Sequence, residues 1–248
     1  MNKAFLVSST LAIALHFVAS ALAPVRAESA FIAPLDVEQS KQLLRTKLAN
    51  LRFFSANFTQ EVISEAGELL EQSSGELAIS KPNLANWHTL EPDELAIVSD
   101  GSDVWFYNPW IEQVSVYSLS AAIAKTPVLL LTSKDESLWQ QYTVTKKSVT
   151  QERVIQKSLN QDKDNQQGER FIISAKDPNS QIKSLTLVFS AKKLNEHSTE
   201  LSQFSFLDTT GQVSHIKLSN FDAQNAPESS LFTFTVPEGV QIDDQRAN

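Results

Sequence analysis

Short segments in which apolar and polar residues alternate recur along most of this chain, and they restrict its fold more than any other feature. The first contains Phe54, Ala56, Phe58 and Val62, separated by polar residues. A period of two places every second side chain on one face of a β-strand. Nine further segments repeat the spacing: Leu77 and Ile79; Leu95 and Ile97; Val104 and Phe106; Val114 and Val116; Tyr142 and Val144; Phe171 and Ile173; Leu185, Leu187 and Phe189; Phe204 and Phe206; Phe232, Phe234 and Val236. The pattern therefore predicts about ten strands.

Turn signals separate these segments. All six glycines fall between the predicted strands, and Asp100-Gly101 is the strongest hairpin signal among them. Successive short strands joined by tight turns favour an antiparallel sheet. A sheet of about ten strands is expected to curl toward a barrel, and above about eight strands the side chains no longer fill the interior. We therefore expect a mainly β fold that encloses a cavity.

Two segments carry helical rather than strand features. Leu44, Leu48 and Leu51 recur at helical spacing, and Asp36 is suited to cap the N-terminus of that helix. The second segment, residues 120–133, contains a proline followed by four apolar residues, which predicts a short helix opened by proline. This apolar run is too short to cross a membrane and too apolar to be exposed. We expect it to cover another apolar surface.

The N-terminus has the features of a cleavable secretion signal. One lysine precedes a mostly apolar run from Ala4 to Ala23, and small residues suited to cleavage follow it. Cleavage after Ala23 would leave a proline next to the cut, so we predict cleavage after Ala27. The chain would then comprise a signal peptide, residues 1–27, and a single domain, residues 28–248. The alternative is an uncleaved membrane anchor, which the polar interruptions of the run disfavour.

Composition and motifs argue against several classes of function. A formal net charge of −8 disfavours binding to nucleic acid and to anionic lipid surfaces. The chain has no cysteine and cannot itself be acylated as bacterial lipoproteins are. It lacks a nucleophile elbow, a phosphate-binding loop and a dinucleotide motif. His88, His197 and His215 lack metal-ligand spacing. We predict no catalytic residue, no metal site and no cofactor.

Several stretches resemble the LolA family of bacterial outer-membrane lipoprotein carriers, and they occur in the family's order. They read FSANFTQ (54–60), KPNLANW (81–87), VSDG (98–101), VWFYNP (104–109), TPVLLL (126–131), WQQY (139–142), FTFTVPEGV (232–240) and DDQR (243–246). The resemblance implies an incomplete antiparallel β-barrel of about eleven strands, with an α-helical lid over an apolar cavity for acyl chains. It covers most of residues 28–248.

The same resemblance implies a function and partners. The protein would be a monomeric, non-enzymatic periplasmic chaperone that binds the acyl chains of lipoproteins. It would receive these lipoproteins from an ATP-driven inner-membrane transporter of the LolCDE type. It would then deliver them to an outer-membrane acceptor lipoprotein of the LolB type. No nucleic acid and no cofactor is implied.

Candidate site residues follow from the resemblance as well. Lys81 stands where the family usually has an arginine that hydrogen-bonds the lid backbone, and lysine lacks the planar fork of arginine, which implies a weaker or rearranged latch. Ala85 stands where the family often has a bulky aromatic residue, so transfer from the transporter would use other contacts. The segment 146–170 is longer than usual. The acyl-chain cavity and lid would use Leu44, Leu48, Leu51, Trp87, Val128, Leu129 and Leu131.

Three alternatives stay open at this point. A periplasmic barrel for lipids or other small hydrophobic ligands, not dedicated to lipoproteins, would have about eight strands as in lipocalins. Such a barrel does not account for the apolar helical segment at 127–131. A lipid hydrolase would need a nucleophile and a base, and no such pair can be nominated. Finally, the same leucines and Trp87 could simply be the core of a domain without a cavity.

Overall fold

We analysed a computed structural model that describes residues 36–123, 127–133, 136–148, 168–194 and 199–246. These residues belong to one compact unit, Pro34–Asn248. The predicted signal peptide, residues 1–27, lies outside the described residues, as does most of the 146–170 segment.

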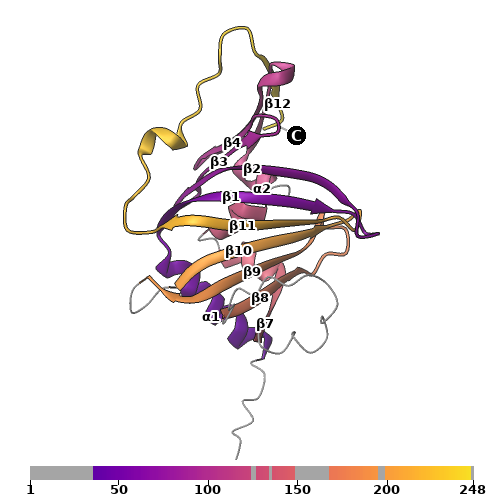
Figure 1. The fold of residues 1–248 in the computed structure, drawn as a ribbon, viewed down its shortest axis with the longest axis vertical. Coiled ribbons are helices and arrows are strands. Elements are labelled where there is room, and N and C mark those ends of the chain that lie inside the picture. The colour runs from indigo at the N-terminus through magenta and orange to yellow at the C-terminus, as the bar shows by residue number, and fades with distance from the viewer. Residues whose placement is uncertain (1–35, 124–126, 134–135, 149–167, 195–198, 247–248) are drawn as a thin grey trace, which may run out of the picture. The chain divides into compact units, whose positions relative to one another are not determined.

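Twelve strands form one sheet in the order β12-β6-β5-β4-β3-β2-β1-β11-β10-β9-β8-β7 (Figure 1). All neighbouring strands are antiparallel except β12 and β6, which are parallel. In the described part of the chain the outermost strands, β12 and β7, do not pair with each other, so the sheet is an incomplete barrel. This confirms the predicted fold class. The strands are β1 (Phe53–Ile63), β2 (Leu69–Ser80), β3 (Leu84–Glu91), β4 (Leu95–Asp100), β5 (Asp103–Asn108), β6 (Gln113–Ser118), β7 (Tyr142–Ser148), β8 (Gly168–Ala175), β9 (Ile182–Lys193), β10 (Thr199–Asp208), β11 (Val213–Asp222) and β12 (Gln241–Asp244).

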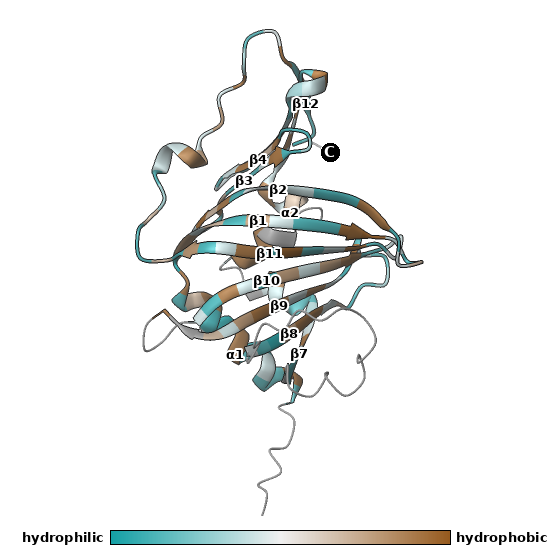
Figure 2. Ribbon diagram, in the orientation of Figure 1, coloured by the Kyte–Doolittle hydropathy of each residue, from teal (hydrophilic) through white to brown (hydrophobic). Residues whose placement is uncertain are grey.

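One face of the sheet carries the hydrophobic core. Hydrophilic and hydrophobic residues alternate along the strands (Figure 2). In β3, for example, Ala85, Trp87 and Thr89 are buried, and the residues between them are more exposed. Burial of one large apolar side chain stabilises a fold by about 1.5–3 kcal/mol. The alternation therefore sets which face of each strand turns inward.

The helical segments lie on the same face of the sheet (Figure 1). Helix α1 (Val37–Asn50) begins at Asp36, whose carboxylate accepts a hydrogen bond from the Gln39 amide at 2.7 Å. The short segments α2 (Leu119–Ile123), η2 (Pro127–Leu131) and α3 (Glu136–Gln140) lie between β6 and β7 in the sequence. Both predicted helices, α1 and the proline-initiated segment, are thus confirmed. Among the described helices, none is long and apolar enough to span a membrane.

The predicted strand around Phe232, Phe234 and Val236 is wrong. Phe232 ends a 3-10 helix, η3 (Ser229–Phe232), and the chain forms no strand until β12. Phe234 instead packs on the opposite face of the sheet, with its ring 5.7 Å from that of Trp105 and 5.6 Å from that of Tyr107. This segment belongs to a C-terminal arm, residues 223–246. Its alternating aromatic residues pack against other side chains and do not mark a β-strand.

The prediction that all glycines lie between strands is also wrong. Gly75 lies within β2, where an added Cβ would stand 2.0 Å from the carbonyl oxygen of His88 in β3. Glycine is required there because the two backbones approach closely. Gly168 begins β8. By contrast, the Asp100-Gly101 hairpin is confirmed, since Gly101 has φ +98° and joins β4 to β5.

Candidate functional site

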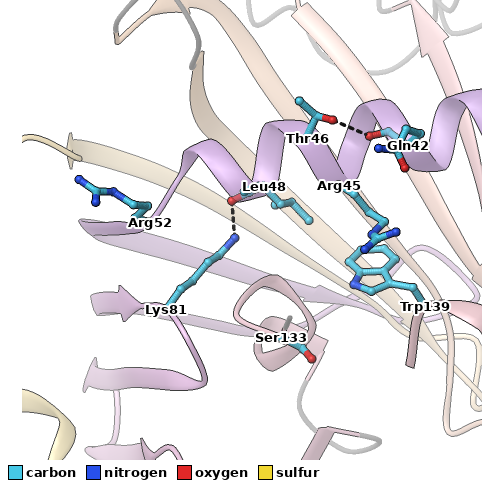
Figure 3. Close-up of a pocket in the computed structure, with 9 residues that line it drawn as sticks. Gln42, Arg45, Thr46, Leu48, Arg52, Lys81, Ser133 and Trp139 are labelled. Atoms are coloured by element: carbon cyan, nitrogen blue, oxygen red, sulfur yellow. Dashed lines mark hydrogen bonds between the residues drawn. The ribbon is translucent and has the colours of Figure 1, made fainter. Parts of the chain in front are cut away.

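The turn between β2 and β3 fastens two covering segments to the sheet. The Lys81 ammonium donates a hydrogen bond to the carbonyl of Leu48, in the last turn of α1 (Figure 3). Two residues later, the Asn83 amide donates to the carbonyl of Thr132 at 3.4 Å, directly after η2. The Asn83 carbonyl is itself fixed, because it accepts a hydrogen bond from the Ser99 hydroxyl at 2.6 Å. One short turn therefore holds both α1 and η2.

Between these segments and the sheet lies a packed apolar cluster. It includes six of the predicted cavity and lid residues, each less than a tenth exposed: Leu44, Leu48, Leu51, Trp87, Leu129 and Leu131. Leu51 is the C-cap residue that directly follows α1. Val128 is in η2, but its side chain lies outside the described residues. The structure thus brings the described members of the predicted set together, with the covering segments closed against the sheet.

Trp87 is at the centre of an aromatic group on the inner face. Its ring centroid lies 3.9 Å from that of Phe58 on β1 and 6.3 Å from that of Phe204 on β10. The indole N–H donates to the Thr89 hydroxyl at 3.0 Å, which satisfies its one polar atom. This group spans both halves of the sheet, and its position depends on the β1–β11 pairing at the centre.

A pocket of about 420 Å³ opens beside this cluster, between α1 and the β2–β3 turn (Figure 3). The sequence predicts two of its lining residues, Lys81 and Leu48, as parts of a site, but not the others. Arg45, Arg52 and Trp139 are the notable additions, and Arg45 lies beside the Trp139 ring. The full described lining is Gln42, Arg45, Thr46, Leu48, Ala49, Arg52, Lys81, Ser133 and Trp139.

Comparison with known proteins gives one consistent family. The family described as outer membrane lipoprotein carrier protein LolA matches residues 49–161 and 149–235. An outer-membrane lipoprotein carrier protein from Aeromonas salmonicida is 33% identical over 203 residues, covering 82% of this chain and 88% of the relative. One from Shewanella sediminis is 38% identical over 206 residues, covering 83% and 86%.

The chain belongs to the LolA family. Among solved structures, a LolA superfamily protein from Nitrosomonas europaea aligns with a TM-score of 0.43 and 11% identity, covering 79% of this chain and 97% of that protein. The twelve-stranded sheet and the covering helices also differ from the eight-stranded lipocalin-type barrel that was the alternative.

The two positions at which the resemblance implies a departure from the LolA pattern lie close together in the structure. Lys81 follows the end of β2, and Ala85 lies near the start of β3, where its side chain is buried on the inner face. In the sheet Ala85 pairs with Ile79 and Ser99. An aromatic residue at this position would have to fit into the inner face.

A second attachment of α1 was not predicted from the sequence. Lys47 lies 2.5 Å from one carboxylate oxygen of Glu169 on β8, and Lys146 on β7 lies 2.5 Å from the other. The Lys47 ammonium also lies 5.4 Å from the centre of the Phe189 ring. Nearer the start of α1, the buried Ser40 hydroxyl accepts a hydrogen bond from the Lys146 amide at 3.3 Å. These contacts bind α1 to the open edge strand, β7.

The two lysines favour the charged form of Glu169. Burial by itself would raise its pKa, but hydrogen bonds from Lys146 and Lys47, with their positive charges, outweigh burial and lower the pKa below its ordinary value. Glu169 lies in the 146–170 segment, and no role was predicted for it from the sequence. The available signal was the position of Lys47, three residues from Leu44 and therefore near the buried side of α1.

In the described residues no group of three or more His, Asp or Glu side chains is placed to hold a metal ion. His88 lies 2.9 Å from Glu94 on the surface, and His197 is outside the described residues. Burial lowers the pKa of His215, a residue of β11. Neither His88 nor His215 lines the pocket beside α1.

Proposed function

We propose that this protein is a periplasmic carrier that binds the acyl chains of lipoproteins between its covering helices and its sheet. The observation that carries the proposal is the turn at Lys81, which fastens both α1 and η2 over one apolar cluster. The same side chains would form a core when the lid is closed and a cavity wall when it opens. In this proposal Leu44, Leu48, Leu51, Trp87, Val128, Leu129 and Leu131 contact the acyl chains.

The energetics of acyl chains account for the need for such a device. Burying a methylene group is worth about 0.8 kcal/mol, so a chain of about fifteen amounts to roughly 12 kcal/mol. A lipoprotein therefore cannot cross water unaided, nor can it leave the inner membrane without an energy source outside this protein. A closed lid lowers the apparent affinity of the carrier, because opening costs free energy before the chain can enter. That lower affinity permits release to an acceptor.

The proposal includes partners and location. An ATP-driven transporter of the LolCDE type would load the carrier at the inner membrane, and an acceptor of the LolB type would unload it at the outer membrane. Residues 1–27 would be removed as a signal peptide, which leaves the single domain 28–248 in the periplasm. The carrier would catalyse no reaction itself. Sequencing the N-terminus of the protein from a periplasmic extract tests the processing, and recovery from the membrane pellet with Met1 intact contradicts it.

The decisive experiment for the function is a release assay. Inner-membrane vesicles that contain the transporter and labelled lipoproteins are incubated with the mature protein and ATP. We expect a soluble complex of carrier and lipoprotein that forms only when ATP is present. If labelled lipoprotein stays with the vesicles while the protein still binds acyl probes, the protein is a general carrier of hydrophobic ligands instead.

A fluorescence experiment tests the site. With Trp105, Trp110 and Trp139 replaced by Phe, Trp87 is the only remaining tryptophan. Because Trp87 packs on Phe58 and Phe204 in the closed state, an acyl chain that enters the cluster changes its surroundings. We expect its emission to shift or be quenched on saturation with an acyl ligand. Unchanged emission at saturation would place the ligand elsewhere.

A further inference from the structure

The pocket beside α1 has a charge that the binding of neutral acyl chains does not require. Its nine described lining residues include three cations, Arg45, Arg52 and Lys81, and no acidic residue. Two other side chains of the lining, Gln42 and Ser133, carry hydrogen-bond donors, whereas the Thr46 hydroxyl donates to the Gln42 carbonyl at 3.0 Å. In a chain with a formal net charge of −8, this is a local concentration of positive charge. Such a concentration favours an anionic ligand.

The pocket also borders the apolar cluster directly. Leu48 and Trp139 line the pocket, and both belong to the buried cluster, with exposed fractions of 5% and 4%. Four other lining residues are exposed to solvent: Gln42, Thr46, Ala49 and Arg52. A molecule bound here would have one end at the cationic rim and could extend its other end past Leu48 into the interior.

We infer that this pocket is a head-group subsite for amphiphiles that carry a carboxylate or a phosphate on an acyl chain. The inference rests on the proposed function, because the tail would occupy the interior proposed for lipoprotein acyl chains. A pocket of about 420 Å³ lies within the usual size range of small-ligand sites. The carrier would thereby take up single-chain anionic lipids in addition to its protein cargo.

The position of Lys81 links the binding of the head group to opening of the lid. In the closed state its ammonium donates to a neutral acceptor, the Leu48 carbonyl. A carboxylate or phosphate in the pocket would offer the same ammonium a charged acceptor, and such hydrogen bonds are roughly twice as strong. The bound anion would draw Lys81 away from Leu48 and release the end of α1. The ligand would then favour the open state that its own tail requires.

A matched ligand series tests this subsite. Binding of dodecanoate, dodecyl phosphate and dodecanol to the mature protein is measured by displacement of a fluorescent acyl probe, below the micelle concentration of each ligand. Acetate and inorganic phosphate are included as heads without tails. We expect the two anionic amphiphiles to bind at least about tenfold more tightly than dodecanol, the effect of one charge-assisted hydrogen bond. Added salt should reduce this preference.

Variants locate the head group. The double variant Arg45→Gln/Arg52→Gln should lose most of the preference for anionic heads and bind dodecanol as the wild type does. The control Lys176→Gln/Lys217→Gln removes the same charge from exposed sites outside the pocket lining and should keep the preference. Circular dichroism of each variant verifies that it is folded.

Each other outcome rejects the inference in a distinct way. Equal affinities for dodecanoate, dodecyl phosphate and dodecanol would leave acyl-chain binding intact and remove the head-group subsite. A preference that survives in Arg45→Gln/Arg52→Gln would place the head elsewhere. Acetate or phosphate that displaces the probe as well as the amphiphiles do would make the pocket a plain anion site. If none of the three amphiphiles binds, both the subsite and the proposed function fail.

Discussion

The two outer strands of the sheet are covered in different ways. Strand β6 is paired with β12 over residues 113–116, and the backbone bonds at the two ends of this pairing run from the Gln241 amide to the Glu112 carbonyl and from the Gln245 amide to the Val116 carbonyl. Arg246 strengthens the pairing through ion pairs with Asp103 and Asp244, and its hydrogen bond lowers the pKa of Asp244 to about 2. The other outer strand, β7, is covered by α1 through side chains.

The difference indicates which edge can open. Separating β12 from β6 would break a row of backbone hydrogen bonds at once. Separating α1 from the sheet at β7 requires the loss of the Ser40 bond, the Lys47–Glu169 ion pair and the Lys81 bond, together with exposure of the apolar face of the helix, but it breaks no row of backbone hydrogen bonds. We therefore assign the fixed edge to β6 and the releasable edge to β7. The predictions below test this assignment.

The largest expected effect comes from Leu44→Ala. Leu44 is fully buried on α1, and removing a buried leucine side chain costs about 2–5 kcal/mol. Leu187→Ala on β9 is the matched control, because Leu187 is equally buried in the sheet. If α1 can leave without unfolding the sheet, Leu44→Ala should shift the urea midpoint less than Leu187→Ala and should raise acyl-probe binding. Equal midpoint shifts with unchanged probe binding would mean that α1 and the sheet unfold as one unit.

Lys81→Leu should have the next largest effect. A hydrogen bond from a charged donor is worth about 1.5–3 kcal/mol, so its loss should shift the lid toward open by up to about a hundredfold. The open lid should hold acyl chains more tightly, so loading persists while passage to the acceptor slows. Lys81→Arg keeps a charged donor and should transfer normally. The measurement is lipoprotein transfer from loaded carrier to acceptor, and a wild-type rate for Lys81→Leu would show that the latch lies elsewhere.

A smaller effect is expected from Ser40→Ala. The Lys146 amide loses its acceptor, which costs about 1 kcal/mol. Hydrogen exchange at β7 should therefore become faster. Ser115→Ala is the control at the other edge, where the Ser115 hydroxyl bonds Asp243 at 3.3 Å. The β12–β6 backbone pairing remains in that variant, so exchange at β6 should not change. Faster exchange at β6 in Ser115→Ala would mean that the β6 edge also depends on side-chain contacts and is not more firmly fixed than the β7 edge.

The smallest effect concerns pH. The pKa of Glu169 is lowered in the folded protein, so its ion pairs stabilise the closed edge fully above its ordinary pKa of 4.5. This stabilisation is lost as the pH falls through the lowered value, because the carboxylate must then take up a proton. Exchange at β7, expressed relative to the intrinsic exchange rate of the amides at each pH, should therefore rise on acidification in the wild type. In Glu169→Gln this relative exchange at β7 should be faster than in the wild type at neutral pH and should change less on acidification. If the variant and the wild type have the same pH profile, Glu169 does not stabilise the closed edge.

Local sequence signals predicted much of the fold. Helix α1 follows from the spacing of its leucines and from Asp36, because capping and helical periodicity act within a few residues. The β4–β5 hairpin follows from Asp100-Gly101 for the same reason. The pattern omitted β3, β11 and β12. In β12 only Ile242 is apolar, and the strand exists because it pairs with β6, far away in the sequence.

The sequence identified Lys81 and the apolar residues of the cluster, but not the contacts that the other charged residues make. Lys81 was identified from the sequence, and the structure places its ammonium on the Leu48 carbonyl. The Glu169 ion pairs depend on the pairing of β7 with β8, which places Lys146 beside β8 while α1 brings in Lys47. The pocket likewise needs α1, α3 and the β2–β3 turn in place before Arg45 and Trp139 meet. Contacts that depend on tertiary arrangement have no signal in local periodicity.

The central pairing of the sheet has a consequence for folding kinetics. Strand β1 is joined on one side to β2, its neighbour in the sequence, and on the other to β11, so that Thr59 lies opposite Lys217. The contact between Thr59 and Lys217 closes a loop that contains most of the sheet. Closing such a long loop is entropically costly, and topologies rich in long-range contacts fold slowly. The aromatic group around Trp87 contains Phe58 from β1, near the start of that loop, and Phe204 from β10, near its end. The nascent chain therefore cannot complete its core until β11 has been synthesised.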